Sequence, residues 1–350
     1  MNTIKYIYNF ILNGHSFANK KEKCAGYPPI IAIEPTNACM MKCIMCPRKY
    51  MKRKIGFMDI NLFKKIIDQA KGCTNMISLE LFGDALLHPK IGEMIDYLHK
   101  KGILSQISTN ATSLSDNAVD KILNSKLDVL LIALDGIDDR TYKKYRGKSA
   151  DYGKAVIQIN NLLKRKIEGK RKKPFIDIRM LGLPGLQEHF NIFKEQWNKQ
   201  GIDKISTNTF HSFGGSVKEI KDSEIGANWT YHGMCFKPWQ GLHIYWDGRV
   251  VPCCFDYDGK VILGNLNKET LEEVWNNKKM QELRKQFLTG KFKSNKLCKT
   301  CKERKYVKIT KHFPFDAFFF NNIIYYLYQR NQNKKIVKIL KGKFWDIQND

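Results

Sequence analysis

The sequence predicts an α/β fold built around a parallel sheet. Short β-branched apolar runs alternate with amphipathic stretches between about residues 28 and 215, which is the pattern of repeated βα units. The chain has 350 residues, 43% of them hydrophobic, which is enough for one large domain and a smaller one. Six βα units fit this region, and periodicity alone does not separate a partial barrel from a doubly wound sheet.

Each expected element follows from local pattern. Helices are expected at Asn61–Asp68, with Asp59 placed as the N-cap, and at Ile91–Leu98. Further on, Gly241–Cys253 is typical of a β-hairpin that turns at Asp247-Gly248. The six expected parallel strands are Ile30–Ile33, Met76–Leu81, Leu104–Thr109, Val129–Leu134, Phe175–Met180 and Lys204–Asn208.

The net charge indicates which kinds of partner the protein could bind, and the cysteine content indicates the cellular compartment. The formal net charge of +26 favours phosphate-bearing substrates, nucleic acid or an anionic membrane surface. The basic residues are scattered, and the aromatic and basic signature of an RNA-binding module is missing, which argues against nucleic acid. Ten cysteines without a secretory leader indicate metal binding in a reducing compartment. The apolar start, Met1–Gly14, is too short to span a bilayer, so we expect a cytoplasmic protein.

Three cysteines follow the first expected strand at the spacing C-x3-C-x2-C. They are Cys39, Cys43 and Cys46. Three thiolates are one fewer than the four that saturate a 4Fe-4S cluster, so one iron is left open for a chelating molecule. The alternatives are a zinc site and three buried structural thiols, but zinc sites usually come as paired C-x2-C clusters with four ligands.

This cysteine loop resembles the signature of the radical S-adenosylmethionine (radical SAM) superfamily. The resemblance implies a six-stranded partial barrel of the TIM type and a 4Fe-4S cluster whose open iron chelates the amino and carboxylate groups of S-adenosylmethionine. It also implies reductive cleavage to a 5′-deoxyadenosyl radical that abstracts hydrogen from a substrate C–H bond. An external electron donor such as flavodoxin or ferredoxin is implied as well. Met45 stands where the family usually has an aromatic residue, and its sulfur can pack against adenine.

Further segments resemble the family's cofactor-binding loops at the C-terminal ends of the strands. Leu81–Pro89 resembles the Gly-Gly-Glu-Pro segment: Gly83 permits close backbone approach, and Asp84 replaces the glutamate that receives the methionyl amino group. In the family's Tyr-x-x-x-Arg-Gly segment, the arginine that corresponds to Arg146 reaches the cofactor carboxylate. The resemblance thus implies these cofactor-binding residues: Met45, Gly83, Asp84, Ser108, Asn110, Asp135 and Arg146.

A second set of cysteines lies in the C-terminal third of the chain. Four thiolates would saturate one further cluster, and the expected hairpin would deliver one of them. The region resembles the SPASM/twitch extension of radical SAM enzymes, and without cysteines beyond the last C-x2-C pair it implies one auxiliary 4Fe-4S cluster. A zinc ribbon is the alternative. The expected ligands are Cys235, Cys253, Cys298 and Cys301. The expected divisions are residues 1–27 as an N-terminal extension, 28–220 as the partial barrel, 221–305 as the small SPASM/twitch domain with its hairpin and 306–350 as an aromatic and basic tail.

Two residues beside the second set are candidates for catalysis. Cys254 directly follows the expected ligand Cys253, at the position where sulfatase-maturating relatives carry an aspartate that removes a proton from the substrate. Two roles are open for its thiol: it acts as a base or hydrogen donor, or it packs behind the hairpin. Asp256 is a rival base, as is His243, for which a structural role or a substrate contact is the expectation. Cys24 and Cys73 lack a partner at ligand spacing and are expected to be core thiols.

The tail and the reaction leave alternatives open. The aromatic run Phe313–Tyr328 and the lysines after it form either a helix docked on the barrel or a contact with an anionic membrane surface. The favoured reaction is oxidation or epimerisation of a small polyol, sugar or nucleotide-linked substrate, with the auxiliary cluster as electron acceptor. Peptide modification is the second hypothesis; only thirty-eight residues precede Cys39, few for a leader-peptide recognition domain. The third is a non-enzymatic, zinc-stabilised binding protein.

Overall fold

The computed structural model describes residues 3–182, 187–209, 211, 213, 217, 235–292 and 295–301. The chain divides into two compact units, Met1–Lys305 and Tyr306–Asp350, and all described residues belong to the first. The predictions for the aromatic and basic tail therefore lie outside the described residues.

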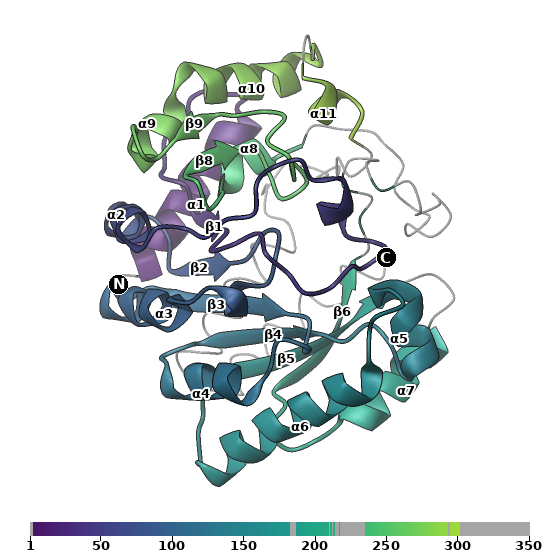
Figure 1. Ribbon diagram of the computed structural model, residues 1–350. Coiled ribbons are helices and arrows are strands. Elements are labelled where there is room, and N and C mark those ends of the chain that lie inside the picture. The colour runs from purple at the N-terminus through teal and green to yellow at the C-terminus, as the bar shows by residue number, and fades with distance from the viewer. Residues whose placement is uncertain are drawn as a thin grey trace. The chain divides into compact units, whose positions relative to one another are not determined.

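A single nine-stranded sheet organises this unit, in the order β6-β5-β4-β3-β2-β1-β7-β8-β9 (Figure 1). The pairs from β6 to β7 are parallel, and the two that include β8 are antiparallel. The strands are β1 Ile30–Ile33, β2 Met76–Leu79, β3 Leu104–Thr109, β4 Val129–Ala133, β5 Phe175–Gly182, β6 Lys204–Thr209, β7 Gly241–Ile244, β8 Arg249–Val251 and β9 Gly264–Asn265. The α/β fold and its six parallel strands are confirmed, and the strand ends fall within two residues of the prediction.

Helices and short 3-10 turns connect the strands. Asp59 caps α2 as predicted, because its Oδ1 accepts hydrogen bonds from the backbone N–H groups of Asn61 and Leu62. No helix in the described part of the chain is long and apolar enough to cross a bilayer. The helical elements are α1 Thr3–Ala18, η1 Pro47–Tyr50, α2 Ile60–Ala70, η2 Ala85–Leu87, α3 Ile91–Lys100, α4 Asp116–Asn124, α5 Asp139–Arg146, α6 Tyr152–Glu168, α7 Gln187–Trp197, α8 Lys237–Gln240, α9 Leu271–Asn276, α10 Lys278–Thr289 and α11 Lys296–Lys299.

The parallel strands have one apolar face and one polar face. On β2, Ile77 and Leu79 are fully buried in the main core, whereas Ser78 between them is only partly buried. On β5, Ile176 and Ile178 belong to the same core, and Asp177 points to the opposite face. This polar face is here called the inner face.

The predicted hairpin exists, but it is not separate from the main sheet. It turns at Gly248, whose φ of 84° suits glycine, and β8 returns antiparallel to β7. β7 also pairs in parallel with β1, which the sequence analysis did not predict. A Cβ atom on Gly241 would lie 2.1 Å from the carbonyl oxygen of Ile30, so this pairing requires glycine. The strand before Cys39 and the hairpin before Cys253 are therefore neighbours in one sheet.

The N-terminal extension packs against the C-terminal helices. Arg284 of α10 is fully buried, and it donates hydrogen bonds to the carbonyl oxygens of Glu22, Pro238 and Trp275 at 2.8 to 3.0 Å. No carboxylate contacts it among the described residues, and burial lowers its pKa to about 10. Figure 1 shows α1 beside α8 at this end of the unit. One buried cation thus joins three segments that are distant in sequence.

Candidate active site

The three cysteines of the first motif lie in a loop that leaves β1 and ends at η1. Within this loop the N–H of Cys46 donates to the carbonyl oxygen of Cys43 at 3.1 Å. The guanidinium Nε of Arg48 donates to the carbonyl oxygen of Asn37 at 2.9 Å. These bonds fold the loop so that Cys43 is buried and the other two thiols are half-buried.

Hydrogen-bond donors point at the sulfur atoms of this loop. Asn110 Nδ2 lies 3.5 Å from Cys39 Sγ, and Arg146 Nη1 lies 3.6 Å from Cys43 Sγ. Burial raises the pKa of Cys39, and it raises that of Cys46 to about 11, so metal binding must displace protons from these thiols. Donors around the sulfurs favour thiolates, and the chemistry of this donor set fits a cluster held at three corners.

Asp84 fixes the donor that faces Cys39. Its Oδ2 accepts hydrogen bonds from Thr109 Oγ1 at 2.8 Å and from Asn110 Nδ2 at 3.0 Å. Its Oδ1 accepts the backbone N–H of Leu86 at 3.1 Å. Burial raises the pKa of Asp84, and these hydrogen bonds lower it in part. The structure therefore gives Asp84 a positioning contact that the sequence analysis did not foresee.

Gly83 brings two loops into backbone contact. Its φ is 94°, and a Cβ atom there would lie 2.5 Å from the carbonyl oxygen of Thr36 and 2.7 Å from that of Ala38. The next residue, Asp84, donates its N–H to the carbonyl oxygen of Ala38 at 2.7 Å. The close approach predicted for this glycine is present, and it ties the loop after β2 to the start of the cysteine loop.

Arg146 and Asp135 form a buried ion pair beside Cys43. Arg146 Nη2 lies 2.6 Å from Asp135 Oδ2 and donates to the carbonyl oxygen of Ala133 at 2.8 Å. Burial disfavours the charged guanidinium, but Asp135 and Cys43 outweigh it and hold the pKa of Arg146 above its ordinary value. The Nε of Arg146 is buried without a partner among the described residues. An unpaired cationic N–H at this point fits an anionic group such as a cofactor carboxylate.

The remaining two residues of this set are placed around the same loops. Met45 is half-buried and packs against the main core and against the small cluster of Leu181 and Val217. Ser108 is half-buried on the inner face of β3. The cofactor roles of both residues stay predictions.

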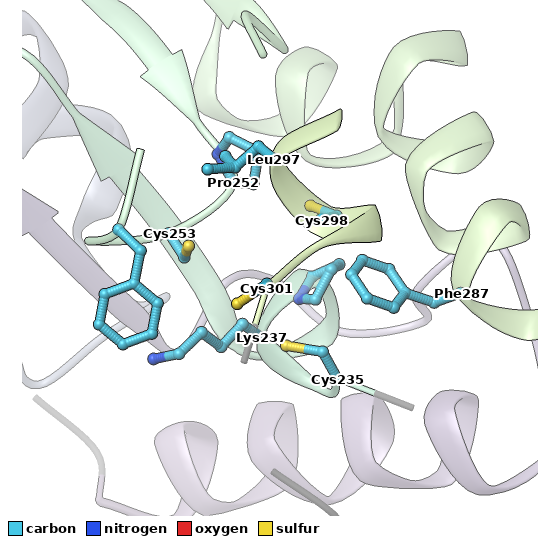
Figure 2. A pocket seen from close by; sticks show the side chains of 10 residues that line it. Cys235, Lys237, Pro252, Cys253, Phe287, Leu297, Cys298 and Cys301 are labelled. Atoms are coloured by element: carbon cyan, nitrogen blue, oxygen red, sulfur yellow. The ribbon is translucent and has the colours of Figure 1, made fainter. Parts of the chain in front are cut away.

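The four cysteines of the second set line one pocket, together with Lys237 (Figure 2). Burial raises the pKa of Cys235 and Cys253, whereas the positive charge of Lys237 lowers it in part. Burial also raises the pKa of Cys298 to about 12. Apart from the thiols and this lysine, the lining is apolar: Pro238, Pro252, Phe255, Phe287 and Leu297. The donor set fits an iron-sulfur cluster with four thiolate ligands.

Among the described residues, no three His, Cys, Asp or Glu side chains are placed to hold a single metal ion. A cubane cluster has another requirement, because each of its thiolate ligands binds a different iron.

Models of two families match this chain. The radical SAM superfamily model matches residues 33–190, and the model of the SPASM iron-sulfur cluster-binding domain matches residues 235–302. The chain is a radical SAM enzyme with a C-terminal SPASM domain. Its cofactors are S-adenosylmethionine, the 4Fe-4S cluster that binds it, and an auxiliary cluster. The zinc-stabilised binding protein is therefore set aside.

Curated relatives of the enzyme carry several different activities. The chain is 23% identical over 300 residues to the tungsten-containing aldehyde ferredoxin oxidoreductase cofactor-modifying protein of Pyrococcus furiosus, covering 74% of this chain and 83% of the relative. It is 22% identical over 275 residues to the S-adenosyl-L-methionine-dependent 2-deoxy-scyllo-inosamine dehydrogenase of Niallia circulans, covering 78% and 92%. These relatives differ in substrate and therefore do not identify the substrate of this enzyme.

Solved structures show the same fold. The crystal structure of BtrN with AdoMet and 2-DOIA has a TM-score of 0.53 at 17% identity, covering 82% of this chain and 97% of that one. The structure of anSMEcpe with bound AdoMet has a TM-score of 0.54 at 16% identity, covering 91% and 99%.

The two candidate catalytic residues of the radical SAM enzyme sit differently. Cys254 is half-buried next to the ligand candidate Cys253, and it is not among the side chains that line the pocket. Asp256 is fully buried, and its two carboxylate oxygens accept the backbone N–H groups of Lys260 and Val261 at 2.8 and 2.9 Å. The Asp256 carboxylate thus stabilises the loop that follows it. The catalytic roles of Asp256 and Cys254 stay predictions.

His243, Cys24 and Cys73 were also singled out by residue type, and they differ in burial. His243 belongs to β7, and its Nδ1 is buried without a hydrogen-bond partner among the described residues. Burial lowers its pKa to about 3, so its ring is neutral. The thiols of Cys24 and Cys73 are buried, as expected for core cysteines.

Sequence analysis missed a set of charged residues on the inner face. Gln106 Nε2 donates to Ser78 Oγ at 3.0 Å and to Glu80 Oε1 at 3.3 Å. Burial raises the pKa of Glu80, and the nearby positive charge of Arg179 lowers it in part. The signal was available, since polar residues alternate with apolar ones in Ile77-Ser78-Leu79-Glu80 and in Ile176-Asp177-Ile178-Arg179.

Arg179 is held on one side of its guanidinium by Asp177. Its Nε and Nη2 both donate to Asp177 Oδ2, at 2.9 and 2.8 Å, and Ser206 Oγ donates to Asp177 Oδ1 at 2.7 Å. The Arg179 side chain is 27% exposed, and its Nη1 has no partner among the described residues. A guanidinium fixed on one side and open on the other is suited to an anionic group.

Proposed function

We propose that this radical SAM enzyme removes two hydrogens from a small polyol, sugar or nucleotide-linked sugar that carries an anionic group. The observation that supports this proposal is the inner face of the sheet, which carries the Glu80 carboxyl and an Arg179 Nη1 that has no partner among the described residues. Arg179 belongs to β5 and Glu80 follows β2, and the two groups are near enough for the positive charge of Arg179 to lower the pKa of Glu80 in part. A substrate that spans them would offer an anion to Arg179 and a hydroxyl donor to Glu80.

In this proposal the chain's own residues bind and orient the reactants. Cys39, Cys43 and Cys46 hold the first cluster, and the unpaired Nε of Arg146 receives the carboxylate of S-adenosylmethionine. Bound together, these cofactors supply hydrogen-atom abstraction from an unactivated C–H bond. Asp84 keeps Asn110 directed at Cys39, and the buried ion pair of Arg146 and Asp135 keeps the neighbouring loop in place.

The second site supports the choice of net oxidation. After one hydrogen atom has left the substrate, a further electron and a proton must leave to complete a dehydrogenation. Four thiols around one pocket provide ligands for a cluster that accepts this electron. Glu80 on the inner face is our candidate to take the proton, because burial raises the pKa of its carboxyl above the ordinary value. The dehydrogenase from Niallia circulans supports the same reaction type.

Isotope transfer tests this proposal. The reconstituted enzyme, with about eight irons for two cubane clusters, would be incubated without oxygen with S-adenosylmethionine, dithionite and candidate substrates deuterated at carbon. The expected result is deuterium in 5′-deoxyadenosine and a product lighter by two hydrogens. A product in which the transferred deuterium has been replaced by one hydrogen, with no further loss, would indicate epimerisation. Deuterium transfer only from a peptide would support the peptide-modifying alternative.

A matched pair of variants tests the anionic group. Arg179→Met should raise KM for the substrate by about tenfold or more, since a charge-assisted hydrogen bond contributes about 1.5–3 kcal/mol. Arg179→Lys should retain part of the affinity, because it keeps the charge and loses the planar fork. Equal KM values for all three proteins would contradict the assignment of Arg179.

A further inference from the structure

A short segment lies between the first cysteine loop and the second cysteine set. It comprises residues 51–58, which follow η1, and is here called the bridging segment. One side of it contacts a residue just before Cys39. Asn37 Nδ2 donates to the carbonyl oxygen of Lys54 at 2.9 Å, and Asn37 Oδ1 accepts the N–H of Gly56 at 3.0 Å. The bridging segment is therefore fixed to the start of the first cysteine loop.

Arg53 reaches from the bridging segment to the turn that follows Cys253. Its Nε donates to the carbonyl oxygen of Tyr257 at 2.8 Å. Asp258 adds a second contact, because its Oδ1 accepts the backbone N–H groups of Lys52 and Arg53 at 2.7 and 3.1 Å. These hydrogen bonds join residues about two hundred positions apart in the sequence.

The guanidinium of Arg53 is buried, and each of its three nitrogens has a partner. Nη1 and Nη2 donate to the two carboxylate oxygens of Glu34 at 2.9 and 2.8 Å, and the two side chains are 3% and 0% exposed. The guanidinium also lies 3.6 Å from the centroid of the Tyr245 ring. A planar fork held by a carboxylate on one side has a fixed orientation, so its Nε is directed at Tyr257.

The turn that Arg53 holds carries an expected ligand of the auxiliary cluster at its other end. Cys253 lines the pocket of the second site (Figure 2), and its carbonyl oxygen accepts the N–H of Asp256 at 3.2 Å. Burial raises the pKa of the Cys253 thiol, and a hydrogen bond from the backbone N–H of Phe255 lowers it in part. An N–H that favours the thiolate also favours the reduced, more negative form of a cluster bound to it.

We propose that Arg53 is a positioning residue for the auxiliary cluster. It fixes the carbonyl group of Tyr257, and the turn from Cys253 to Tyr257 then holds the N–H of Phe255 toward the ligand sulfur. Arg53 lies within residues 33–190, which the radical SAM model matches, whereas the turn belongs to the SPASM domain. The auxiliary cluster thus depends on a residue of the other domain. The consequence for substrate oxidation rests on the proposed function, and the effect on the cluster does not.

Two variants remove the contact in different ways. Glu34→Gln/Arg53→Met removes both buried charges together, so neither charge is left unpaired. Asp258→Ala removes the acceptor of two backbone N–H groups at a half-buried position. Asp258→Asn is the matched control for the alanine variant, because the amide keeps an acceptor oxygen.

A second control removes an ion pair far from the hairpin. Lys166 Nζ lies 2.8 Å from Asp203 Oδ2, just before β6, and β6 and β9 are the two edge strands of the sheet. Lys166→Met/Asp203→Asn should therefore lower overall stability, measured by urea unfolding, without changing a contact of either cysteine set.

The midpoint potential of the auxiliary cluster is the main measurement. Each reconstituted holoenzyme would be titrated without oxygen and followed by electron paramagnetic resonance. Addition of S-adenosylmethionine changes the signal of the first cluster, because the cofactor binds its open iron, and so identifies the other signal as the auxiliary one. Release of iron to a chelator would be followed in parallel.

The expected shift has a definite sign. Glu34→Gln/Arg53→Met should make the auxiliary cluster about tenfold harder to reduce, a fall of about 59 mV for a one-electron couple. Asp258→Ala should shift the potential in the same direction by less. In both variants about four of about eight irons should reach the chelator faster than in the wild type. Asp258→Asn and Lys166→Met/Asp203→Asn should match the wild type in potential and in iron release.

Other results would overturn the assignment of Arg53. One is a wild-type potential and release rate in both contact variants. Another is an equal shift in Lys166→Met/Asp203→Asn, which would show that the potential follows overall stability. Selective loss of the first cluster would assign the bridging segment to the first site instead. If the double variant does not fold, the comparison of Asp258→Ala with Asp258→Asn decides.

Failure of the proposed function gives a different result. A wild-type enzyme that oxidises no polyol or sugar would contradict that function, and the potentials would still decide the role of Arg53. If the proposed function holds, Glu34→Gln/Arg53→Met should still cleave S-adenosylmethionine and should form less oxidised product for each cleavage.

Discussion

The two cysteine sites differ most in what surrounds their sulfur atoms. At the first site, polar side chains from neighbouring loops reach the thiols, with Asn110 facing Cys39 and Arg146 facing Cys43. At the second site, prolines, phenylalanines and a leucine line the pocket, and Lys237 is the charged residue of its lining besides the thiols. The first site thus offers polar contacts beside its thiols, and the second surrounds its thiols mainly with apolar side chains.

The cysteine count agrees with this difference in surroundings. The first motif offers three thiols beside a buried N–H of Arg146 that has no partner among the described residues, which suits a cofactor that completes the site. The second offers four thiols in one pocket, so no ligand is missing. The two sites therefore differ both in the number of thiol ligands that they offer and in the polarity of the side chains around those thiols.

Removing either cysteine set should give the largest effects, and the two sets should affect different steps of the reaction. The triple variant Cys39→Ala/Cys43→Ala/Cys46→Ala should lose cleavage of S-adenosylmethionine and retain about four irons. The double variant Cys253→Ala/Cys298→Ala should retain that cleavage and lose product formation, because the electron acceptor is gone. Iron analysis and chromatography of 5′-deoxyadenosine measure both outcomes. If both variants lose cleavage equally, the division of labour between the sites is wrong.

Gly83→Ala should damage the first site selectively. The added methyl group would meet two carbonyl oxygens at 2.5 and 2.7 Å, and alanine disfavours the φ of 94°. We expect a loss of at least about 2 kcal/mol in the free energy of unfolding and weaker iron binding at the first site. Gly92→Ala is the control, because a Cβ there has nothing within 4 Å and alanine favours helix α3. Similar denaturant midpoints for the two variants would contradict the close-approach argument.

Lys237→Met should change the second site without removing its cluster. The positive charge in the pocket favours the reduced, more negative form of the cluster, so its loss should lower the midpoint potential. Lys237→Arg keeps the charge and should leave the potential near that of the wild type. A redox titration followed by electron paramagnetic resonance measures the shift. An unchanged potential in the methionine variant would show that this charge does not act on the cluster.

We expect a smaller effect from His88, in the loop after β2 beside the first site, on the pH dependence of the free energy of unfolding. The Nδ1 of His88 accepts the N–H of Lys90 at 3.1 Å, its Nε2 lies 3.0 Å from the carbonyl oxygen of Met58, and burial lowers its pKa below 6.5. As the pH falls through 6.5, His88 therefore binds a proton in the unfolded chain while it is still neutral in the folded protein. This favours the unfolded chain, so the free energy of unfolding decreases as the pH falls.

Urea unfolding at several pH values measures this contribution. Between pH 7 and 5, His88→Gln should remove a slope of at most about 1.4 kcal/mol per pH unit, the value for one proton. His99→Gln, at an exposed position on α3, should leave the slope unchanged. A wild-type slope in the His88 variant would show that this ring does not titrate with folding.

Much of the fold could be predicted from local sequence patterns. The candidate site could not, because it depends on contacts between segments that are distant in sequence. Alternating apolar residues predicted the six strands, and Asp59 predicted the start of α2, because both signals lie within a few residues. The pairing of β7 with β1 joins segments about two hundred residues apart, and no local pattern encodes it. The bonds from Asp84 to Thr109 and Asn110 likewise depend on how two loops meet. The inner-face residues have a local signal, because polar and apolar residues alternate in Ile77-Ser78-Leu79-Glu80, but this signal does not say which strands bring their side chains together.

The central claim is that only the first cluster coordinates S-adenosylmethionine. Electron nuclear double resonance with the cofactor labelled with ¹⁵N at its amino group tests it directly, using the two cysteine variants. We predict a ¹⁵N coupling in Cys253→Ala/Cys298→Ala and none in Cys39→Ala/Cys43→Ala/Cys46→Ala, which keeps the auxiliary cluster. A coupling in the triple variant would contradict the account.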